Sequence, residues 1–153
     1  MAIPTLTAEH RRLELLVGHW QGTETMYPSQ WDPEGGEAIG RNYSRLALNG
    51  FALITDYEQE RDGVLTFRGH GVMTYDPQAA RYEMYWFDSM GSRPEHFTGN
   101  FEGDVLTLSH AGPGMHARLT YDLSEPGLLG SRMEMSPDGQ EWRTFFECTY
   151  APR

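Results

Sequence analysis

The stretch EAIGRNYSRLALNGFALITDYEQERDG (residues 37–63) decides the fold that we expect from the sequence. It holds two long strand-like runs, and each run is followed by a turn dipeptide, Asn49-Gly50 or Asp62-Gly63. Both residues of such a dipeptide tolerate a positive φ, which the tight turn of a β-hairpin requires. A connection this short joins antiparallel neighbours, because parallel strands need a long crossover. The stretch therefore predicts antiparallel β-structure.

The same alternation of strand-like runs and turn residues continues over the rest of the chain, and gives about ten strands of ordinary length. They are expected at His19–Tyr27, Glu37–Leu48, Phe51–Glu60, Val64–Asp76, Arg81–Ser89, Glu95–Glu102, Val105–His110, Met115–Leu123, Leu128–Ser136 and Gln140–Tyr150. An up-and-down sheet of this kind leaves two long unpaired edges unless it closes on itself. We therefore predict an all-β fold, a closed antiparallel up-and-down β-barrel wide enough to hold a ligand. A two-sheet sandwich is the alternative closure.

A short helix is expected before the strands, over about residues 5–17. Thr7 suits the N-cap position, and Leu13 and Leu16 recur at helical spacing. Gly18 is placed to end the helix with a positive φ. A chain of 153 residues fits one domain, so we expect residues 1–153 to form a single barrel domain.

The composition limits the partners. The formal net charge is -10, from 22 acidic and 12 basic residues, so the chain lacks the clustered positive surface that nucleic acid or an anionic membrane requires. No window has the apolar length of a membrane span, and the N-terminus has no signal-peptide pattern. The single cysteine, Cys148, cannot form an internal disulfide and is expected to be a small buried hydrophobe. These features favour a cytoplasmic location.

The sequence has no phosphate-binding glycine-rich loop, zinc-ligand spacing or nucleophile elbow. It therefore predicts no cofactor and no metal, and it leaves any catalytic residue unknown.

The strand expected at Arg81–Ser89 carries the main candidate site. Trp86 and Asp88 share one face of it with two bulky residues, so Asp88 follows them into the interior. A buried carboxylate needs a partner or a raised pKa. The most economical partner is an inward Arg41 or Arg45, because neither face of their strand is cleanly apolar. Such a pair either anchors a ligand or only fixes the register.

Further side chains complete the candidate ligand-binding set. The glycines that flank His70 suggest a bulge or bend that aims His70 at the cavity, and His96 lies on a polar face with the same possibility. Trp31 lies in a loop with two prolines and two glycines, which is either a packed Ω-loop or a lid over the barrel mouth. The candidate ligand-binding residues are Trp31, Arg41, Tyr43, Arg45, His70, Trp86, Asp88, Met90 and His96.

Several motifs occur in a characteristic order. The segment Leu13–Gly22 has the pattern L-x-x-L-x-G-x-W-x-G, and GHGVMTYD (residues 69–76) and WFDSMG (residues 86–91) follow. In this order and spacing the chain resembles a bacterial family of uncharacterised proteins, domain of unknown function fifteen seventy-nine, grouped with calycin-like (lipocalin-like) barrels. The resemblance implies a closed barrel with a ligand-capable interior and no assigned reaction.

In calycins the tryptophan of the G-x-W element plugs one end of the barrel, often under an arginine of the last strand. By this likeness Trp20 is structural, with Arg143 or Arg153 stacked on it. Trp86 and Met90 belong to a family-like W-x-D-x-M pattern and stay candidates for the cavity.

The first functional hypothesis is a binding module that holds a small hydrophobic or amphipathic molecule, with Asp88, an inward arginine and Tyr43 as polar contacts. The alternative is a small-molecule enzyme, an isomerase, cyclase or hydrolase, that uses Asp88 or His70 as acid or base.

A third possibility has two forms. The first is haem binding, as in the nitrobindin-like proteins of similar fold, although their proximal histidine has no counterpart here because no histidine follows His116. The second is a non-catalytic scaffold that forms a homodimer through an outer row of Tyr85, Phe87 and Phe97.

Overall fold

The turn dipeptides of the opening stretch adopt the backbone that a tight turn needs. The computed structural model, which describes residues 2–153, gives Asn49 a φ of 60° and Asp62 a φ of 50°. The two turns join β2 (Gly36–Ala47) to β3 (Ala52–Arg61) and β3 to β4 (Val64–Asp76), all antiparallel. The predicted hairpins are thus confirmed.

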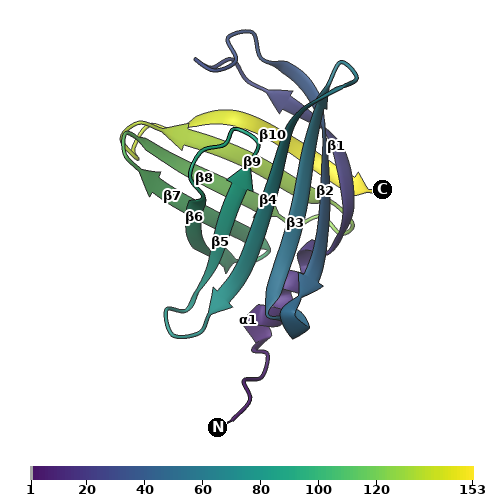
Figure 1. Cartoon of the computed structure of the whole chain (residues 1–153), viewed down its shortest axis with the longest axis vertical. Coiled ribbons are helices and arrows are strands. Elements are labelled where there is room, and N and C mark those ends of the chain that lie inside the picture. Colours follow the sequence, from purple (N-terminus) through teal and green to yellow (C-terminus); the bar gives the residue numbers. More distant parts are fainter. Residues whose placement is uncertain (1) are drawn as a thin grey trace.

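Ten antiparallel strands close into one barrel in chain order (Figure 1). The others are β1 (Gly18–Met26), β5 (Arg81–Asp88), β6 (Glu95–Glu102), β7 (Val105–Gly112), β8 (Met115–Asp122), β9 (Leu129–Ser136) and β10 (Arg143–Pro152). The barrel closes where β1 pairs with β10, with Trp20 opposite Pro152 and Met26 opposite Phe146. The predicted closed barrel is confirmed, and the sandwich alternative is wrong because both edge strands are paired with each other.

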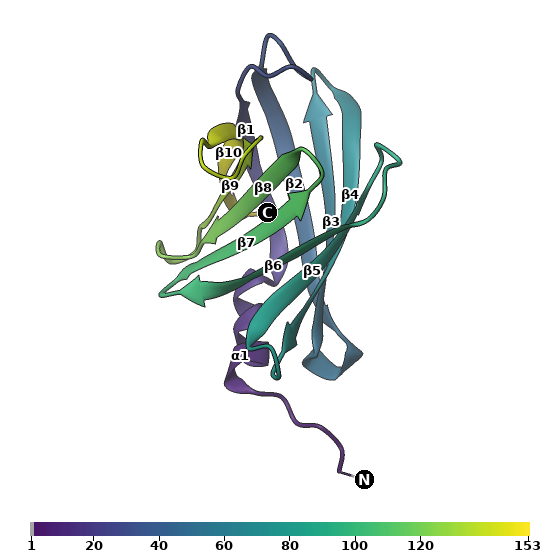
Figure 2. The same ribbon diagram turned by 90° about the vertical axis from the view of Figure 1, so that its left-hand side faces the viewer.

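The predicted helix forms as two short segments, α1 (Ala8–Arg11) and the 3₁₀ helix η1 (Arg12–Leu16). Thr7 is the N-cap, as expected, and its hydroxyl accepts a hydrogen bond from the His10 amide. Figure 2 shows α1 beneath one end of the barrel, which we call the helix end. No helix within residues 2–153 has the length and apolar character needed to span a membrane.

Apolar packing fills the helix end. Leu13 and Leu16 are buried against Trp20, whose indole Nε1 donates to the Leu16 carbonyl at 3.1 Å. The Tyr82 hydroxyl donates to the carbonyl of Glu9 at 2.5 Å and ties α1 to β5. Each fully buried leucine stabilises the fold by about 1.5–3 kcal/mol.

The expected stacking of Arg143 or Arg153 on Trp20 is wrong. The guanidinium–ring contacts within residues 2–153 pair Arg12 with Phe101, Arg45 with Tyr43 and Arg118 with Trp142. Arg143 pairs with Met135 of β9, far along β10 from the residues opposite Trp20. The orientation of Trp20 is fixed instead by its hydrogen bond to the helix.

Candidate functional site

A buried carboxylate faces the interior of the barrel on β1. Glu24 alternates in phase with Trp20 and Met26 and is fully buried. Its carboxylate oxygens accept hydrogen bonds from the Tyr57 hydroxyl at 2.7 and 2.8 Å and from the Tyr150 hydroxyl at 2.5 Å. These three residues come from three different strands, so closure of the barrel assembles the cluster.

Neighbouring residues complete this cluster and make room for it. The Gln59 amide nitrogen donates to Glu24 at 2.9 Å and to the Tyr57 hydroxyl at 3.1 Å. A Cβ atom at Gly40 of β2 would lie 2.0 Å from Glu24 Oε2, so the absence of a side chain there provides the space for the carboxylate. We call Glu24, Tyr57, Gln59 and Tyr150 the Glu24 cluster.

Burial controls the ionisation of the groups around Glu24. It raises the pKa of Tyr57 and of Tyr150 well above the usual range, and the negative charge of Glu24 raises them further. Both phenols therefore keep their protons at neutral pH and act as donors. Burial, followed by the charge of Glu24, also raises the pKa of the Cys148 thiol to about 12. Cys148 is thus a buried neutral thiol, as expected, and not a reactive thiolate.

An aromatic wall stands beside the Glu24 cluster. The Trp86 indole covers two glycines of β4, since a Cβ at Gly69 would lie 2.1 Å from its Cζ2 atom and one at Gly71 would lie 3.2 Å from its Cε3 atom. The ring centroids of Trp86 and Tyr57 are 6.3 Å apart. The glycines around His70 therefore accommodate an indole, and the pairing of β4 with β5 continues past them without a bulge.

Titratable side chains surround the opposite end of the interior from α1, which we call the mouth end. Asp88 accepts hydrogen bonds from Trp86 Nε1 and from the Met90 amide, both at 3.0 Å. Glu95 lies next to His110, with 3.9 Å between Oε2 and Nε2. Burial raises the pKa of Glu95, the charge of Asp88 adds to this rise, and His110 opposes it.

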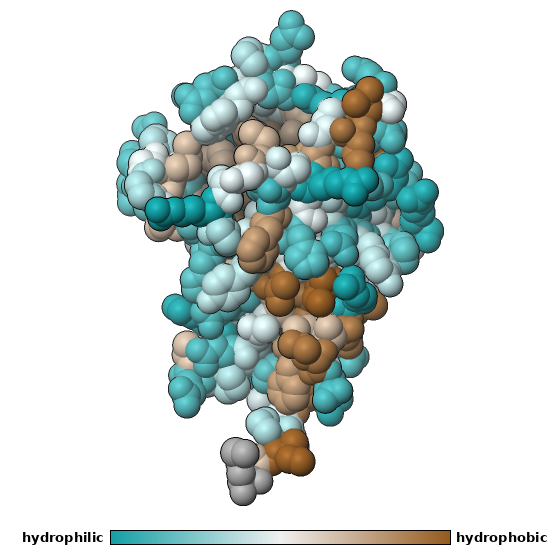
Figure 3. All heavy atoms as spheres, in the orientation of Figure 1, coloured by the Kyte–Doolittle hydropathy of each residue, from teal (hydrophilic) through white to brown (hydrophobic). Residues whose placement is uncertain are grey.

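Several inward-phased side chains at the mouth end are only partly buried, whereas Leu13, Leu16 and Trp20 beside α1 belong to the buried core. The partly buried ones include Trp86, Met133, Met135 and Phe146. Figure 3 shows the surface hollowed near the upper end of the molecule, with apolar side chains inside the hollow and hydrophilic ones around it.

The prediction that Arg41 or Arg45 points inward to pair with Asp88 is wrong. The buried residues of β2 have the opposite phase, so both arginines and Tyr43 lie on the outer face. Arg41 pairs there with Glu58 at 3.3 Å, and Arg45 pairs with Asp56 at 3.2 Å. Space explains this phase, because the interior beside β2 is occupied by side chains of β1 and β3 and admits only small residues.

The two candidate histidines also lie outside. His70 contacts Asp56 through Nδ1 at 2.7 Å, and this hydrogen bond lowers the pKa of Asp56. His96 stacks on Tyr85 at 4.5 Å and contacts Glu83 at 2.9 Å. The expectation that either ring faces the cavity is therefore wrong.

Met90 and Trp31 lie at the mouth end but outside the buried interior. Met90 follows β5 and is 75% exposed. Trp31 is 57% exposed and packs edge-on against Phe145 with 6.1 Å between ring centroids. Of the predicted ligand-binding residues, Trp86 and Asp88 are the two that line the interior.

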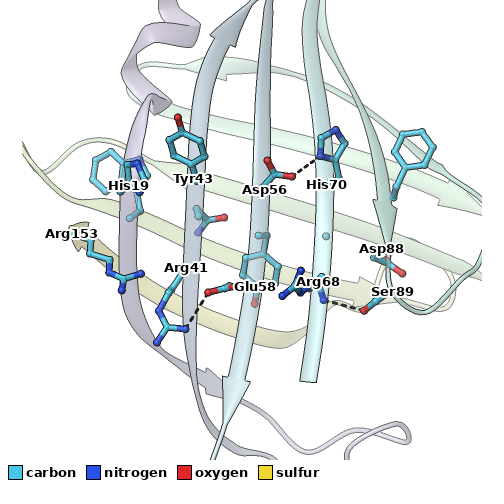
Figure 4. Close-up of a pocket in the computed structure, with 15 residues that line it drawn as sticks. His19, Arg41, Tyr43, Asp56, Glu58, Arg68, His70, Asp88, Ser89 and Arg153 are labelled. Carbon is cyan, nitrogen blue, oxygen red and sulfur yellow. Dashed lines mark hydrogen bonds and ion pairs between the residues drawn. The ribbon is translucent and has the colours of Figure 1, made fainter. Parts of the chain in front are cut away.

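Three of the predicted residues that lie outside, Arg41, Tyr43 and His70, do come together in a groove on the outer surface of β1 to β5. The groove encloses about 630 Å³, and its floor is the backbone of a cross-strand row that includes Asn42 and Gly69. Figure 4 shows the flanking rows, and most of their charges are paired with one another. The labelled residues are His19, Tyr43, Asp56 and His70 in one row, and Arg153, Arg41, Glu58, Arg68 and Ser89 in the other. Asp88, which pairs with Gly69 at the end of the floor row, is labelled as well and also lines this groove. Exposed ion pairs of this kind contribute little to the stability of the fold.

Sequence reasoning missed the Glu24 cluster and the pair of Glu95 and His110. A signal was present for each, because Glu24 has the phase of Trp20 and His110 has the phase of the apolar Leu106 and Leu108. A polar residue in phase with core residues is the pattern that marks such a site.

The fold and the site together define the class of this protein, which is a closed ten-stranded antiparallel β-barrel with a helix at one end and a polar cluster in its interior. The chain belongs to the family described as protein of unknown function (DUF1579), whose sequence pattern matches residues 5–151. This confirms the resemblance noted in the sequence. The comparison with curated proteins gives no match.

Two solved structures share the fold. Rv2717c from M. tuberculosis is 16% identical, with a TM-score of 0.66 over 97% of this chain and 99% of that chain. The S-type phycobiliprotein lyase CPES from Guillardia theta is 11% identical, with a TM-score of 0.63 over 94% of this chain and 92% of that chain. At such identities the likeness concerns the fold alone.

Proposed function

We propose that the barrel binds a small hydrophobic or amphipathic molecule in the mouth half of its interior. The observation that carries this proposal is the Glu24 cluster, a polar centre around the fully buried Glu24, beside inward side chains of the mouth end that are only partly buried. Ligand sites combine mostly apolar walls with a few convergent polar groups. Trp86 supplies the principal wall, and Asp88 and Glu95 stand at the rim.

Native mass spectrometry of the purified protein tests this proposal, and a mass above that of the chain is expected. Titration with the neutral dye Nile red provides a second test through quenching of tryptophan fluorescence. Trp86→Phe should remove most of the quenching. Trp142→Phe is the matched control, because Trp142 packs on Arg118 at the outer face and should leave the quenching unchanged. Absence of both a bound mass and Nile red binding refutes the proposal.

A second candidate is proton-transfer chemistry at the same place, which the orientation of His110 favours. Its Nδ1 lies 2.8 Å from the carbonyl of His96 and donates to it, so Nε2 is the ring nitrogen that is available for proton transfer. Nε2 can take a proton from a substrate carbon and return it to another carbon of the same molecule, which is an isomerisation without a co-reactant.

Deuterium uptake tests this second candidate without knowledge of the substrate. A metabolite extract incubated in D₂O with the protein should contain a compound that gains one mass unit per exchanged proton. His110→Gln should abolish the exchange, and His116→Gln, at an outward position of β8, should not. Equal exchange by both variants rules out this role for His110.

A further inference from the structure

The charged groups at the mouth end are unevenly distributed between the two faces of the barrel wall. Three carboxylates, those of Glu24, Asp88 and Glu95, have inward positions. Arg41 and Arg45, in contrast, lie outside and pair with other carboxylates. The interior that we propose as a binding site therefore has a negative electrostatic potential.

Arg61 has an inward position, but its guanidinium already pairs with a carboxylate of a loop. Arg61 follows Tyr57 and Gln59 in alternation at the end of β3. Its guanidinium pairs with Asp32 at 2.9 Å and donates to the carbonyl of Gly35 at 3.2 Å. It thus secures the loop that precedes β2 and does not neutralise the interior.

Glu24 is hydrogen-bonded but has no counter-charge. All its donors are neutral groups, two phenols and an amide, and within residues 2–153 no basic side chain lies at ion-pair distance from it. Buried charges in proteins are ordinarily paired with an opposite charge or a metal. His110, a basic group at the rim, faces Glu95.

From this we infer that the interior selects a cationic ligand with a flat apolar body, such as an aromatic amine or an N-heteroaromatic cation, over an anionic one. The inference rests on the proposed function and specifies its ligand class. A cation supplies the counter-charge that Glu24 lacks. It is also attracted by Asp88 and Glu95, in surroundings that screen charge poorly. The Trp86 face adds a cation–π contact, and its area matches a flat ring. An anion meets three carboxylates in the same space.

Two dyes of opposite charge test the inference. Thioflavin T is a flat aromatic cation, and 8-anilinonaphthalene-1-sulfonate is an aromatic anion, and both fluoresce when they are taken out of water. We expect thioflavin T to bind at least about tenfold more tightly than the anionic dye, since like-charge juxtaposition in a desolvated site is strongly unfavourable. Increasing salt should weaken the binding of thioflavin T only slightly if the dye is buried.

Variants locate the source of the preference. Asp88→Asn combined with Glu95→Gln should lower the affinity for thioflavin T about fivefold or more, with a smaller effect on Nile red. Glu24→Gln should act in the same direction. If Glu24→Gln fails to fold, the rim variants decide alone, because their side chains are only partly buried. Glu58→Gln and Tyr43→Ser change only the outer groove and should leave both affinities unchanged.

The outcomes separate the two proposals. Nile red binding with equal or tighter binding of the anionic dye overturns the cationic ligand class and leaves the proposed function intact. A preference for thioflavin T that disappears in Tyr43→Ser or Glu58→Gln also overturns it, since the dye then lies in the outer groove. Failure of all three dyes to bind, together with the absence of a bound mass in native mass spectrometry, overturns both proposals.

Discussion

The two ends of the barrel are built from the same strands and differ in what their inward side chains do. At the helix end, Leu13, Leu16 and Trp20 are buried in contact with one another, and the hydrogen bond of Trp20 ends on the helix. At the mouth end, the inward positions include Glu24 and Trp86, and two glycines give the indole its space. Under the proposed function, this difference predicts that stability is concentrated at the helix end and ligand binding at the mouth end.

The largest effect is expected from removing apolar volume at the helix end. Leu13→Ala should lower the free energy of unfolding by about 2–5 kcal/mol, because the side chain is completely buried and leaves a cavity. Urea denaturation measures this change. Leu15→Ala, at an exposed position of the same helix, is the matched control and should cost far less. Nile red affinity should be unchanged in Leu13→Ala below its unfolding transition, and a parallel loss of binding would contradict the separation of the two ends.

A substitution at the mouth end should have the opposite signature, with a large effect on binding and a smaller one on stability. In Gly69→Ala the new methyl group would lie 2.1 Å from the Trp86 ring, so the indole must move. Overpacking of this kind costs about 1–3 kcal/mol, and Nile red binding should be largely lost. Gly71→Ala, with a contact of 3.2 Å, should be milder. Recovery of stability in the double variant Gly69→Ala with Trp86→Leu would identify the clash as the cause.

The pH dependence of stability reports on Cys148, the buried thiol near Glu24. The folded state raises the pKa of Cys148 to about 12 from an ordinary value of 9.0, so the protonated thiol stabilises the fold fully below about pH 9. Above that pH the unfolded chain releases a proton that the folded state retains, and the stabilisation is lost as the pH rises toward 12. The urea midpoint should fall between pH 8.5 and about pH 10.5. The urea midpoint of Cys148→Ala should fall less steeply with pH. That of Thr149→Ala should follow the wild type, because the side chain of Thr149 points outward.

The fold could be predicted from the sequence because its determinants are local. Turn dipeptides such as Asn49-Gly50 require particular backbone angles, and the strand alternation that places Trp86 and Asp88 inward is visible within one segment.

The outer row of aromatic residues that was predicted to form a homodimer could be tested only in part. Phe97 is 2% exposed and faces the core, so its assignment to the outer row is wrong, while Tyr85 and Phe87 are each 47% exposed. A dimer through these two residues stays a prediction.

The face of β2 that points into the barrel could not be predicted, because it depends on the side chains of the neighbouring strands. Its apolar Ile39 and its aromatic Tyr43 lie outside, and its small Ala38, Gly40 and Ser44 are buried. This inverts the usual rule for a half-buried strand. The physical cause is volume, since Glu24 from β1 occupies the space where a side chain at Gly40 would lie. Complementary sizes across strands become visible only when the register is known.

The smallest effect is expected at Trp31, and it tests whether the mouth end has a cover. The indole is largely exposed and touches Phe145, while Arg61 secures its loop through Asp32. Trp31→Ala should change the free energy of unfolding by no more than about 0.5 kcal/mol, because little area is buried. If the loop covers the mouth, Nile red should dissociate several times faster in stopped-flow fluorescence, with a smaller change in association. An unchanged dissociation rate would assign Trp31 to a packed Ω-loop, and the mouth end would then differ from the helix end in having no cover from this loop.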